Sequence, residues 1–212
     1  MKRAITTGIF LAFSLWALGQ NAVDLGLSVK WASCNVGATA PEQYGEYYAW
    51  GETSAKDIYS WNNHKWFDPN SKAKMDYKLS KYCSVKDYGT VDKKKELDLE
   101  DDVARAKLKG NWRMPTADEW EELLKKCSWQ WTTQKGVKGY LVKSLKNGNS
   151  IFLPAAGHKI KDEISGEGNL GFYWSNNTGF GPNAYSVSFG SANRLKGSTL
   201  RSEGQSVRAV CE

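Results

Sequence analysis

The stretch from Trp112 to Leu124 constrains the fold most strongly, because it defines where a helix begins and which of its faces is apolar. Thr116 and Glu119 have capping-box spacing, in which each side chain accepts a hydrogen bond from the other residue's backbone amide. Pro115 fixes its own φ and keeps the residue before it extended. Apolar residues then recur at helical spacing, at Trp120, Leu123, Leu124 and Cys127. The sequence therefore predicts a short amphipathic helix beginning at Thr116, with an apolar face that the rest of the chain must cover.

Residues 1–19 have the layout of a secretory signal peptide. Lys2 and Arg3 precede a mostly apolar run, and the Ala-Leu-Gly at 17–19 fits a small-x-small cleavage site. A retained membrane anchor is the alternative, but the run is shorter than the about 20 apolar residues that span a bilayer. We expect export to the medium, periplasm or cell surface and no membrane span after cleavage. Residues 20–212 then form a single domain.

Charge does not favour a nucleic-acid partner. The formal net charge is +6, but acids and bases are interleaved along the chain. The lysines at 93–95 are followed at once by acidic residues between Glu96 and Asp102. A nucleic-acid-binding domain would carry a basic stripe, and none is present in this sequence.

Four cysteines, an even number, are typical of an exported chain with disulfide bonds. Three connectivities are open among Cys34, Cys83, Cys127 and Cys211, and free thiols are the alternative. No two cysteines have C-x-x-C spacing, and the only histidines are His64 and His158, so the sequence does not favour a zinc site.

The remaining pattern predicts an α+β domain. Leu27, Val29 and Trp31 alternate with polar residues within a predicted strand at 23–36. A polar, loop-like segment covers 53–96, and a helix is expected at 97–108. Its acidic start could hold calcium, although it lacks EF-hand spacing and stabilisation of the helix start is the simpler explanation. Asn-Gly at 147–148 predicts a hairpin of strands 137–145 and 150–156, and a mobile loop follows at 159–171. Short strands are expected at 171–175, 184–189, 194–200 and 206–211.

Candidate catalytic residues are few. Glu119 and Glu122 share a helix face, but Glu119 is committed to the helix cap. The chain has no Gly-x-Ser-x-Gly, and His158 lies in a loop. We therefore expect no catalytic residues.

A spaced set of motifs covers nearly all of residues 23–210. They are Val-Asp-Leu-Gly-Leu-Ser-Val-Lys-Trp-Ala at 23–32, Asn-Val-Gly-Ala at 35–38, Tyr-Gly at 44–45, Ala-Trp-Gly-Glu at 49–52, Trp-Arg-Met-Pro-Thr at 112–116, Phe-Leu-Pro-Ala-Ala-Gly at 152–157, Tyr-Trp-Ser at 173–175 and Ser-Val-Arg at 206–208. The set resembles the Fibrobacter succinogenes major-paralogous-domain family of exported bacterial proteins. More distantly it is similar to formylglycine-generating-enzyme-like domains of the C-type-lectin-like fold.

This resemblance implies two helices flanking a small antiparallel sheet with long loops, and first and last strands that pair. It also implies a bond between Cys34 and Cys211, which leaves Cys83 with Cys127. The oxidase branch of the fold needs a reactive cysteine pair in its C-terminal third, and residues 128–210 contain no cysteine. The calcium-dependent lectins need an acid-rich loop, whereas residues 165–212 hold only three acids. No cofactor is therefore expected, and calcium is not favoured.

The segment 173–210 is similar in layout to the variable proteins of diversity-generating retroelements, which display changeable residues on a fixed lectin-like scaffold. Alternation places Tyr185, Val187 and Phe189 on one strand face and Ser186 and Ser188 on the other. The expected ligand-contacting residues are Asn176, Asn177, Asn183, Ser186, Ser188, Asn193, Arg194, Lys196 and Gln205. Asn, Ser and Gly with scattered aromatics are adaptable contact chemistry, although the same residues also suit ordinary polar loops.

These patterns predict an exported, non-catalytic recognition module that binds an extracellular protein or glycan through its C-terminal loops. One alternative is a structural or adhesive subunit of a surface assembly. Another is an enzyme of the formylglycine-generating-enzyme-like fold that uses an unrecognised carboxylate pair.

Overall fold

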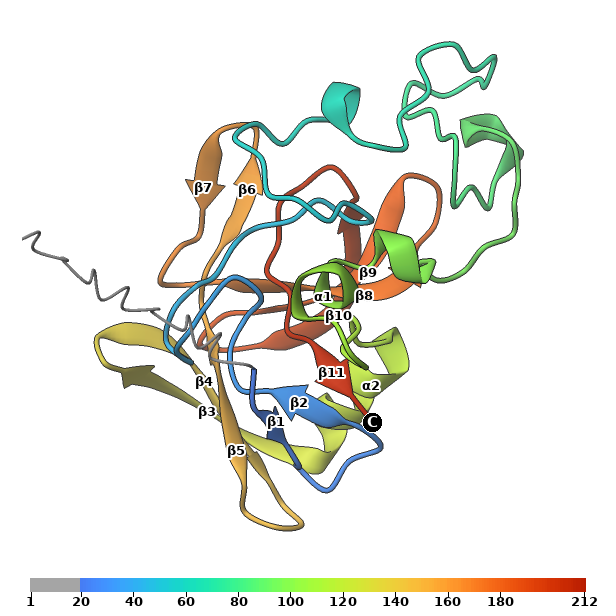
Figure 1. Cartoon of the computed structure of the whole chain (residues 1–212). Helices are drawn as coiled ribbons and strands as arrows, with labels where there is room; N and C mark the ends of the chain where they lie inside the picture. The colour runs from blue at the N-terminus through green and yellow to red at the C-terminus, as the bar shows by residue number, and fades with distance from the viewer. Residues whose placement is uncertain (1–19) are drawn as a thin grey trace, which may run out of the picture.

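The computed structural model describes residues 20–212, and the predicted signal peptide lies outside the described residues. These residues form a mixed α and β structure with two α-helices and several small antiparallel sheets (Figure 1). The helices are α1 (Val103–Leu108) and α2 (Ala117–Lys126), with short 3-10 turns η1 (Trp61–Asn63), η2 (Lys86–Tyr88) and η3 (Leu99–Asp101). The strands are β1 (Ala22–Val23), β2 (Lys30–Ala32), β3 (Cys127–Gln134), β4 (Val137–Ser144), β5 (Ser150–Pro154), β6 (His158–Ile160), β7 (Glu163–Ser165), β8 (Gly171–Thr178), β9 (Asn183–Phe189), β10 (Arg194–Leu200) and β11 (Val210–Cys211).

Four small sheets organise the described residues. The terminal strands form the sheet β1-β2-β11, in which Val210 of β11 lies opposite Trp31 of β2. The predicted first strand at 23–36 contains β2, so the pairing of β2 with β11 confirms that the N-terminal and C-terminal strands are neighbours, and Figure 1 shows β2 in blue beside β11 in red. The other sheets are β3-β4-β5, β10-β9-β8 and the hairpin β6-β7.

The predicted helix and its capping box are confirmed in α2. The Thr116 hydroxyl accepts from the Glu119 amide at 3.1 Å, and the Glu119 carboxylate accepts from the Thr116 amide at 2.7 Å. Trp120 on the apolar face is fully buried, and its ring lies 4.7 Å from that of Trp31. The same core takes in Tyr173 from β8, so α2 joins the terminal sheet to β8.

Several element boundaries differ from the prediction. The strand expected at 23–36 forms only β1 and β2, and the one expected at 206–211 forms only β11. The helix expected at 97–108 divides into η3 and α1, because the Asp102 carboxylate caps α1 by accepting from the amides of Ala104 and Arg105. Residues 159–171 include the hairpin β6-β7 rather than only a loop, and β3 was not predicted.

The segment 53–96 packs around a small apolar cluster of its own, formed by Trp61, Leu79 and Cys83. His64 stacks on Trp61 with ring centroids 5.2 Å apart. Its Nε2 lies 3.0 Å from the Trp50 carbonyl oxygen, so this bond ties the segment to the body of the domain.

All four cysteines are free thiols, which differs from the expected disulfide bonds. The strand register places Cys211 opposite Lys30, four positions from Cys34. Strand residues rise about 3.3 Å each, whereas bonded cysteines have Cα atoms about 6 Å apart. Cys83 and Cys127 belong to two different apolar clusters. The register therefore offsets Cys211 from Cys34 although β2 and β11 are neighbours, and packing in different clusters separates Cys83 from Cys127.

Arg208 is completely buried and has no carboxylate within ion-pair distance in the described chain. Its guanidinium donates to the carbonyl oxygens of Ala32, Ser33 and Phe152 at 2.8–3.0 Å and to Asn35 Oδ1 at 3.0 Å. These bonds join the segment before β11 to the end of β2 and to β5.

Replacing Arg208 with Met is expected to lower the free energy of unfolding by more than about 3 kcal/mol, because it leaves several buried acceptors without a donor. Chemical denaturation monitored by tryptophan fluorescence measures this loss. The matched control is Arg105→Met on α1, where the change should stay within about 0.5 kcal/mol. Equal losses in the two variants would contradict the role given to Arg208.

Acid is expected to destabilise the domain through His64. Burial lowers the pKa of His64 from 6.5 to about 3. The unfolded chain therefore takes up a proton on His64 below about 6.5 that the folded chain does not accept until about 3. The free energy of unfolding should fall as pH drops through this window, and His64→Gln should fall less steeply. Parallel pH profiles for the two proteins would argue against this coupling.

Candidate binding groove

A groove of about 530 Å³ runs between the start of α2 and the sheet β10-β9-β8. It brings together residues from six separate stretches of the chain. Its lining residues are Ser84, Lys95, Glu96, Thr116, Ala117, Asp118, Asn177, Thr178, Gly179, Tyr185 and Lys196. Two of the predicted contact residues, Asn177 and Lys196, are among them.

An irregularity in β8 shapes this groove. Trp174 lies opposite Ser186 of β9, but the next pair is Thr178 with Ala184, so β8 has extra residues between the two pairs. The carbonyl groups in the bulge find other donors. Trp120 Nε1 donates to the Trp174 carbonyl at 3.1 Å, and Trp50 Nε1 donates to the Ser175 carbonyl at 2.8 Å. These buried indoles stabilise the bulge in one conformation.

The bulge directs Asn177 at the start of α2. The Ala117 amide donates to Asn177 Oδ1 at 2.7 Å, and Asn177 Nδ2 donates to Glu96 Oε1 at 3.3 Å. The neighbouring Asn176 amide donates to the Pro115 carbonyl at 2.8 Å. Asn177 therefore joins three walls of the groove, and its amide oxygen already satisfies one free donor of the helix.

An ion pair lies across the other wall. Lys196 of β10 contacts the carboxylate of Glu121 on α2, which also binds Lys125 at 2.5 Å. These hydrogen bonds, first from Lys125 and then from Lys196, hold the pKa of Glu121 at about 2. The bond to Glu121 raises the pKa of Lys196. The two side chains therefore stay charged at neutral pH and connect α2 to β10.

Tyr185 offers an aromatic surface in the groove. It shares a strand face with the buried Val187 and Phe189, yet it is 40% exposed. The reason is its position opposite the β8 bulge, where the register pairs no β8 residue with Tyr185. Sequence alternation placed Tyr185 with the core residues, and only the irregular register makes it accessible.

The structure does not bring all the predicted contact residues to this surface. Asn176, Ser186 and Gln205 are buried, so their assignment as ligand contacts is wrong for this conformation. The physical reason is that one core packs Tyr173, Val187 and Phe189, and a second core packs Trp174 and Ala184. Since successive residues point to opposite faces, the sheet is covered on both sides and polar residues are enclosed with apolar ones. Asn183 and Ser188 are half-buried, and Asn193 and Arg194 are exposed near the β9–β10 turn.

Other lining residues were not predicted as contacts, among them Lys95, Thr178 and Asp118. The capping box predicts that Asp118 lies in the first turn of α2. It does not predict which strand lies next to that turn. That information lies in the tertiary arrangement of 95–96, α2 and β8.

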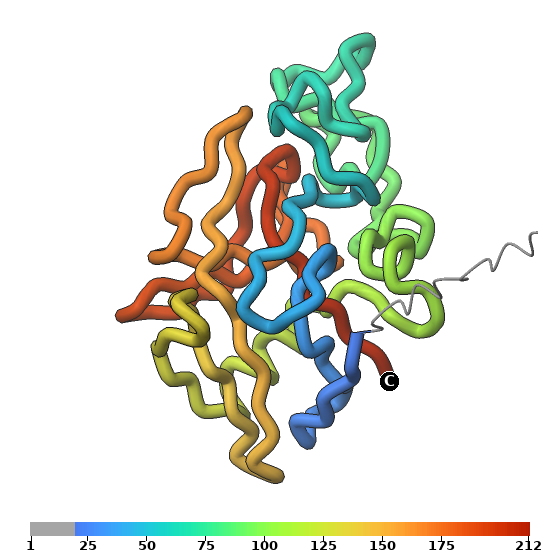
Figure 2. The backbone as a smooth tube through the Cα atoms, turned by 60° about the vertical axis from the view of Figure 1, so that its left-hand side comes forward, coloured from blue at the N-terminus to red at the C-terminus, as the bar shows by residue number. Residues whose placement is uncertain are grey.

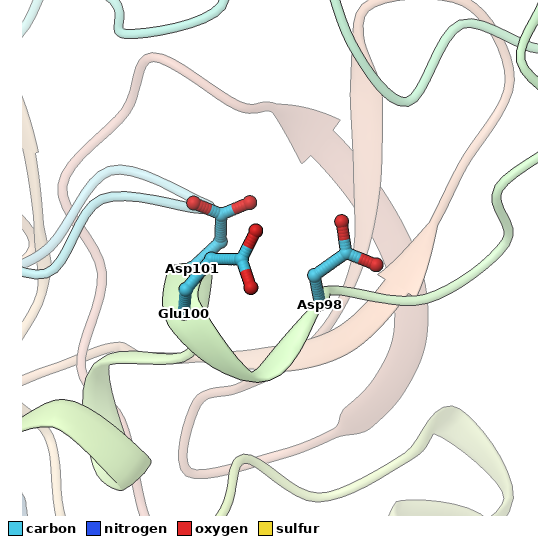
Figure 3. Close-up of side chains that lie close together, drawn as sticks. All are labelled: Asp98, Glu100 and Asp101. Carbon is cyan, nitrogen blue, oxygen red and sulfur yellow. The ribbon is translucent and has the colours of Figure 1, made fainter.

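The acidic residues Asp98, Glu100 and Asp101 lie together around η3 (Figure 3). Lysines already neutralise this cluster. Lys81 Nζ lies 2.7 Å from both Asp98 Oδ2 and Asp101 Oδ2, and Lys65 Nζ lies 2.7 Å from Asp101 Oδ1. The bonds from lysine hold the pKa of Asp98 at about 2. The cluster is therefore better suited to stabilising the start of the α1 region than to holding calcium.

No family model matches this chain, nor does any curated protein or solved structure. Across residues 20–212 no helix combines the length and apolar character needed to cross a membrane.

Millimolar calcium is expected to shift the melting temperature by less than about 1 °C, because a ligand that does not bind cannot stabilise the folded state. Lys81→Met should lower the melting temperature without calcium, since two carboxylates lose their shared cation. Differential scanning fluorimetry with and without a chelator measures both effects. A calcium-dependent rise in the unaltered protein would contradict the assignment.

Proposed function

We propose that this chain is an exported, non-catalytic recognition module with a C-type-lectin-like fold, as in the Fibrobacter succinogenes major-paralogous-domain family. The pairing of β2 with β11 and the small antiparallel sheets support this proposal. So does the resemblance of the spaced motifs along the chain. Export is proposed from the N-terminal sequence pattern alone.

The observation that carries the proposed binding function is the exposure of Tyr185 within a polar groove. Ligand sites combine an apolar or aromatic surface with a few polar groups that fix orientation. Here the tyrosine ring lies in a groove with the carboxylate of Asp118, the ammonium of Lys196 and the amide of Asn177.

Of the two ligand classes, a glycan fits this groove better than a folded protein. A volume of about 530 Å³ is within the range of small-molecule sites. The apolar face of a sugar ring can pack on Tyr185 while its hydroxyl groups bond to carboxylate and amide groups at the rim. The C-terminal segment supplies Tyr185 and Lys196, from strands β9 and β10 rather than from the C-terminal loops that the sequence predicts.

The test is an array of immobilised glycans and surface proteins, probed with the purified domain with and without a chelator. Tyr185→Ala should weaken binding to a glycan found on the array by about tenfold or more, because it removes the stacking surface. Calcium removal should have no effect. Tyr77→Ala is the matched control, since Tyr77 is also 40% exposed and lies outside the groove. Equal binding by the two variants would reject the groove as the site.

A further inference from the structure

The outer edge of β10 is a second feature that can bind a partner, through backbone groups that lie outside the groove together with the side chains of the strand. β10 is the edge strand of the sheet β10-β9-β8 and pairs with β9 without a break from Arg194 to Leu200. Residues 194–198 are all exposed, and Leu195 is 58% exposed. The turn between β9 and β10 lies at the margin of the domain (Figure 2).

The direction of the β10 backbone groups follows from the two ends of the β9–β10 ladder. In an antiparallel pair, hydrogen-bonded residue pairs alternate with pairs that are not bonded to each other. The Gly190 amide donates to the Asn193 carbonyl at 3.0 Å, and the Arg201 amide donates to the Pro182 carbonyl at 3.1 Å. Both bonds have the same phase in the ladder.

Residues 193 and 201 therefore both belong to hydrogen-bonded pairs, and so do the alternate residues between them. The β10 residues whose backbone groups bond to β9 are 195, 197 and 199. The amide and carbonyl groups of Arg194, Lys196 and Ser198 therefore point away from β9. Within residues 20–212 no other strand or backbone group pairs with them. The free edge thus presents alternating donors and acceptors over three positions.

The usual protections of an edge strand are only partly present. β10 contains no proline and no bulge, and no strand of the described residues pairs with its outer edge. A side chain added at Gly197 would meet nothing within 4 Å. The remaining protection is charge, since Arg194 and Lys196 lie on one face of the strand. Arg194 packs over Trp129 and has no carboxylate within ion-pair distance in the described chain.

We infer that this edge accepts an extended, acidic segment of a partner protein as an added β-strand. Residues opposite each other in adjacent strands share a face of the sheet. The partner residue opposite Arg194 is therefore acidic, and the partner residue opposite Leu195 is apolar, whereas Lys196 already pairs with Glu121. The backbone supplies affinity, and the alternating side chains supply selectivity.

Charge also argues against a second copy of this chain as the occupant. Antiparallel pairing of two β10 edges would bring the arginine and lysine of each copy close to those of the other. Like charges in neighbouring strands are destabilising, and the chain as a whole carries a net charge of +6. An acidic partner strand instead places opposite charges on the neighbouring strands and is attracted by the net positive charge of the chain.

The probe for this inference is a fluorescent seven-residue peptide of alternating Glu and Val, with blocked termini, and its binding is followed by anisotropy. Ser198→Pro removes the outward amide and should weaken binding tenfold or more, whereas the matched variant Ser198→Ala keeps that amide and should bind within twofold of the unaltered protein. Arg194→Glu should also weaken binding tenfold or more, and a Lys-Val peptide should bind at least tenfold more weakly. Circular dichroism verifies that each variant is folded.

Amide exchange identifies the site directly, since the peptide should protect the amides of Arg194, Lys196 and Ser198. Tyr185→Ala should bind the peptide normally, which separates this inference from the proposed glycan groove. Absence of peptide binding, equal affinity of the two Ser198 variants, or loss of binding in Tyr185→Ala would overturn the inference. A dimer that Ser198→Pro disrupts would identify a second copy as the occupant and overturn it as well.

Discussion

The bonds from two buried indoles to the bulge of β8 determine how the groove is built. Where β8 leaves its register with β9, the carbonyl groups of Trp174 and Ser175 would lie in the interior without partners. A buried unpaired carbonyl group costs roughly 1–3 kcal/mol. The indoles of Trp120 and Trp50 supply these donors, one from each of the two cores. The bulge, the orientation of Asn177 and the exposure of Tyr185 therefore depend on two residues that no ligand in the groove would touch.

Two buried arginines fix the chain on either side of the final loop. Arg208 is held by carbonyl and amide oxygens rather than by an acid. Arg201 donates to the carbonyl groups of Tyr82 and Asn183 and packs over the Trp50 ring at 4.7 Å. Burial lowers the pKa of Arg201 to about 10, which still leaves it charged at neutral pH. A buried charge is costly unless hydrogen-bond partners surround it, and both arginines depend on acceptors that this fold supplies. Substitutions in 201–210 are therefore restricted, whereas residues 194–198 are exposed to solvent.

The sequence predicted features that depend on neighbouring residues. The α2 cap requires only Thr116 and Glu119, and the hairpin of β4 and β5 requires only the Asn-Gly turn and its apolar flanks. The ligand-contacting residues were harder to predict. Strand alternation shows which residues share a face of the sheet, but it does not show which other elements cover that face. Gln205 is polar and follows a glycine, yet it is fully buried and its Nε2 donates to Thr199 Oγ1 at 2.5 Å. The disulfide expectation failed for a related reason, since it depended on the register of β11 against β2 and on which core each cysteine enters, and neither can be read from local sequence.

The C-terminal segment contains buried residues that hold the fold together and exposed residues that are available for contacts. In β8 and β9 the side chains of Tyr173, Trp174, Ala184, Val187 and Phe189 enter one of two cores, so changes at these positions affect stability before they affect binding. In β10 the side chains of 194–198 reach solvent, while its inward backbone groups keep the strand attached to β9 through bonds that do not depend on side-chain identity. A strand of this kind can change its surface chemistry without losing its place in the sheet. That physical separation is what a recognition module needs, and here it depends on an ordinary antiparallel ladder together with the Lys196–Glu121 pair that connects β10 to α2.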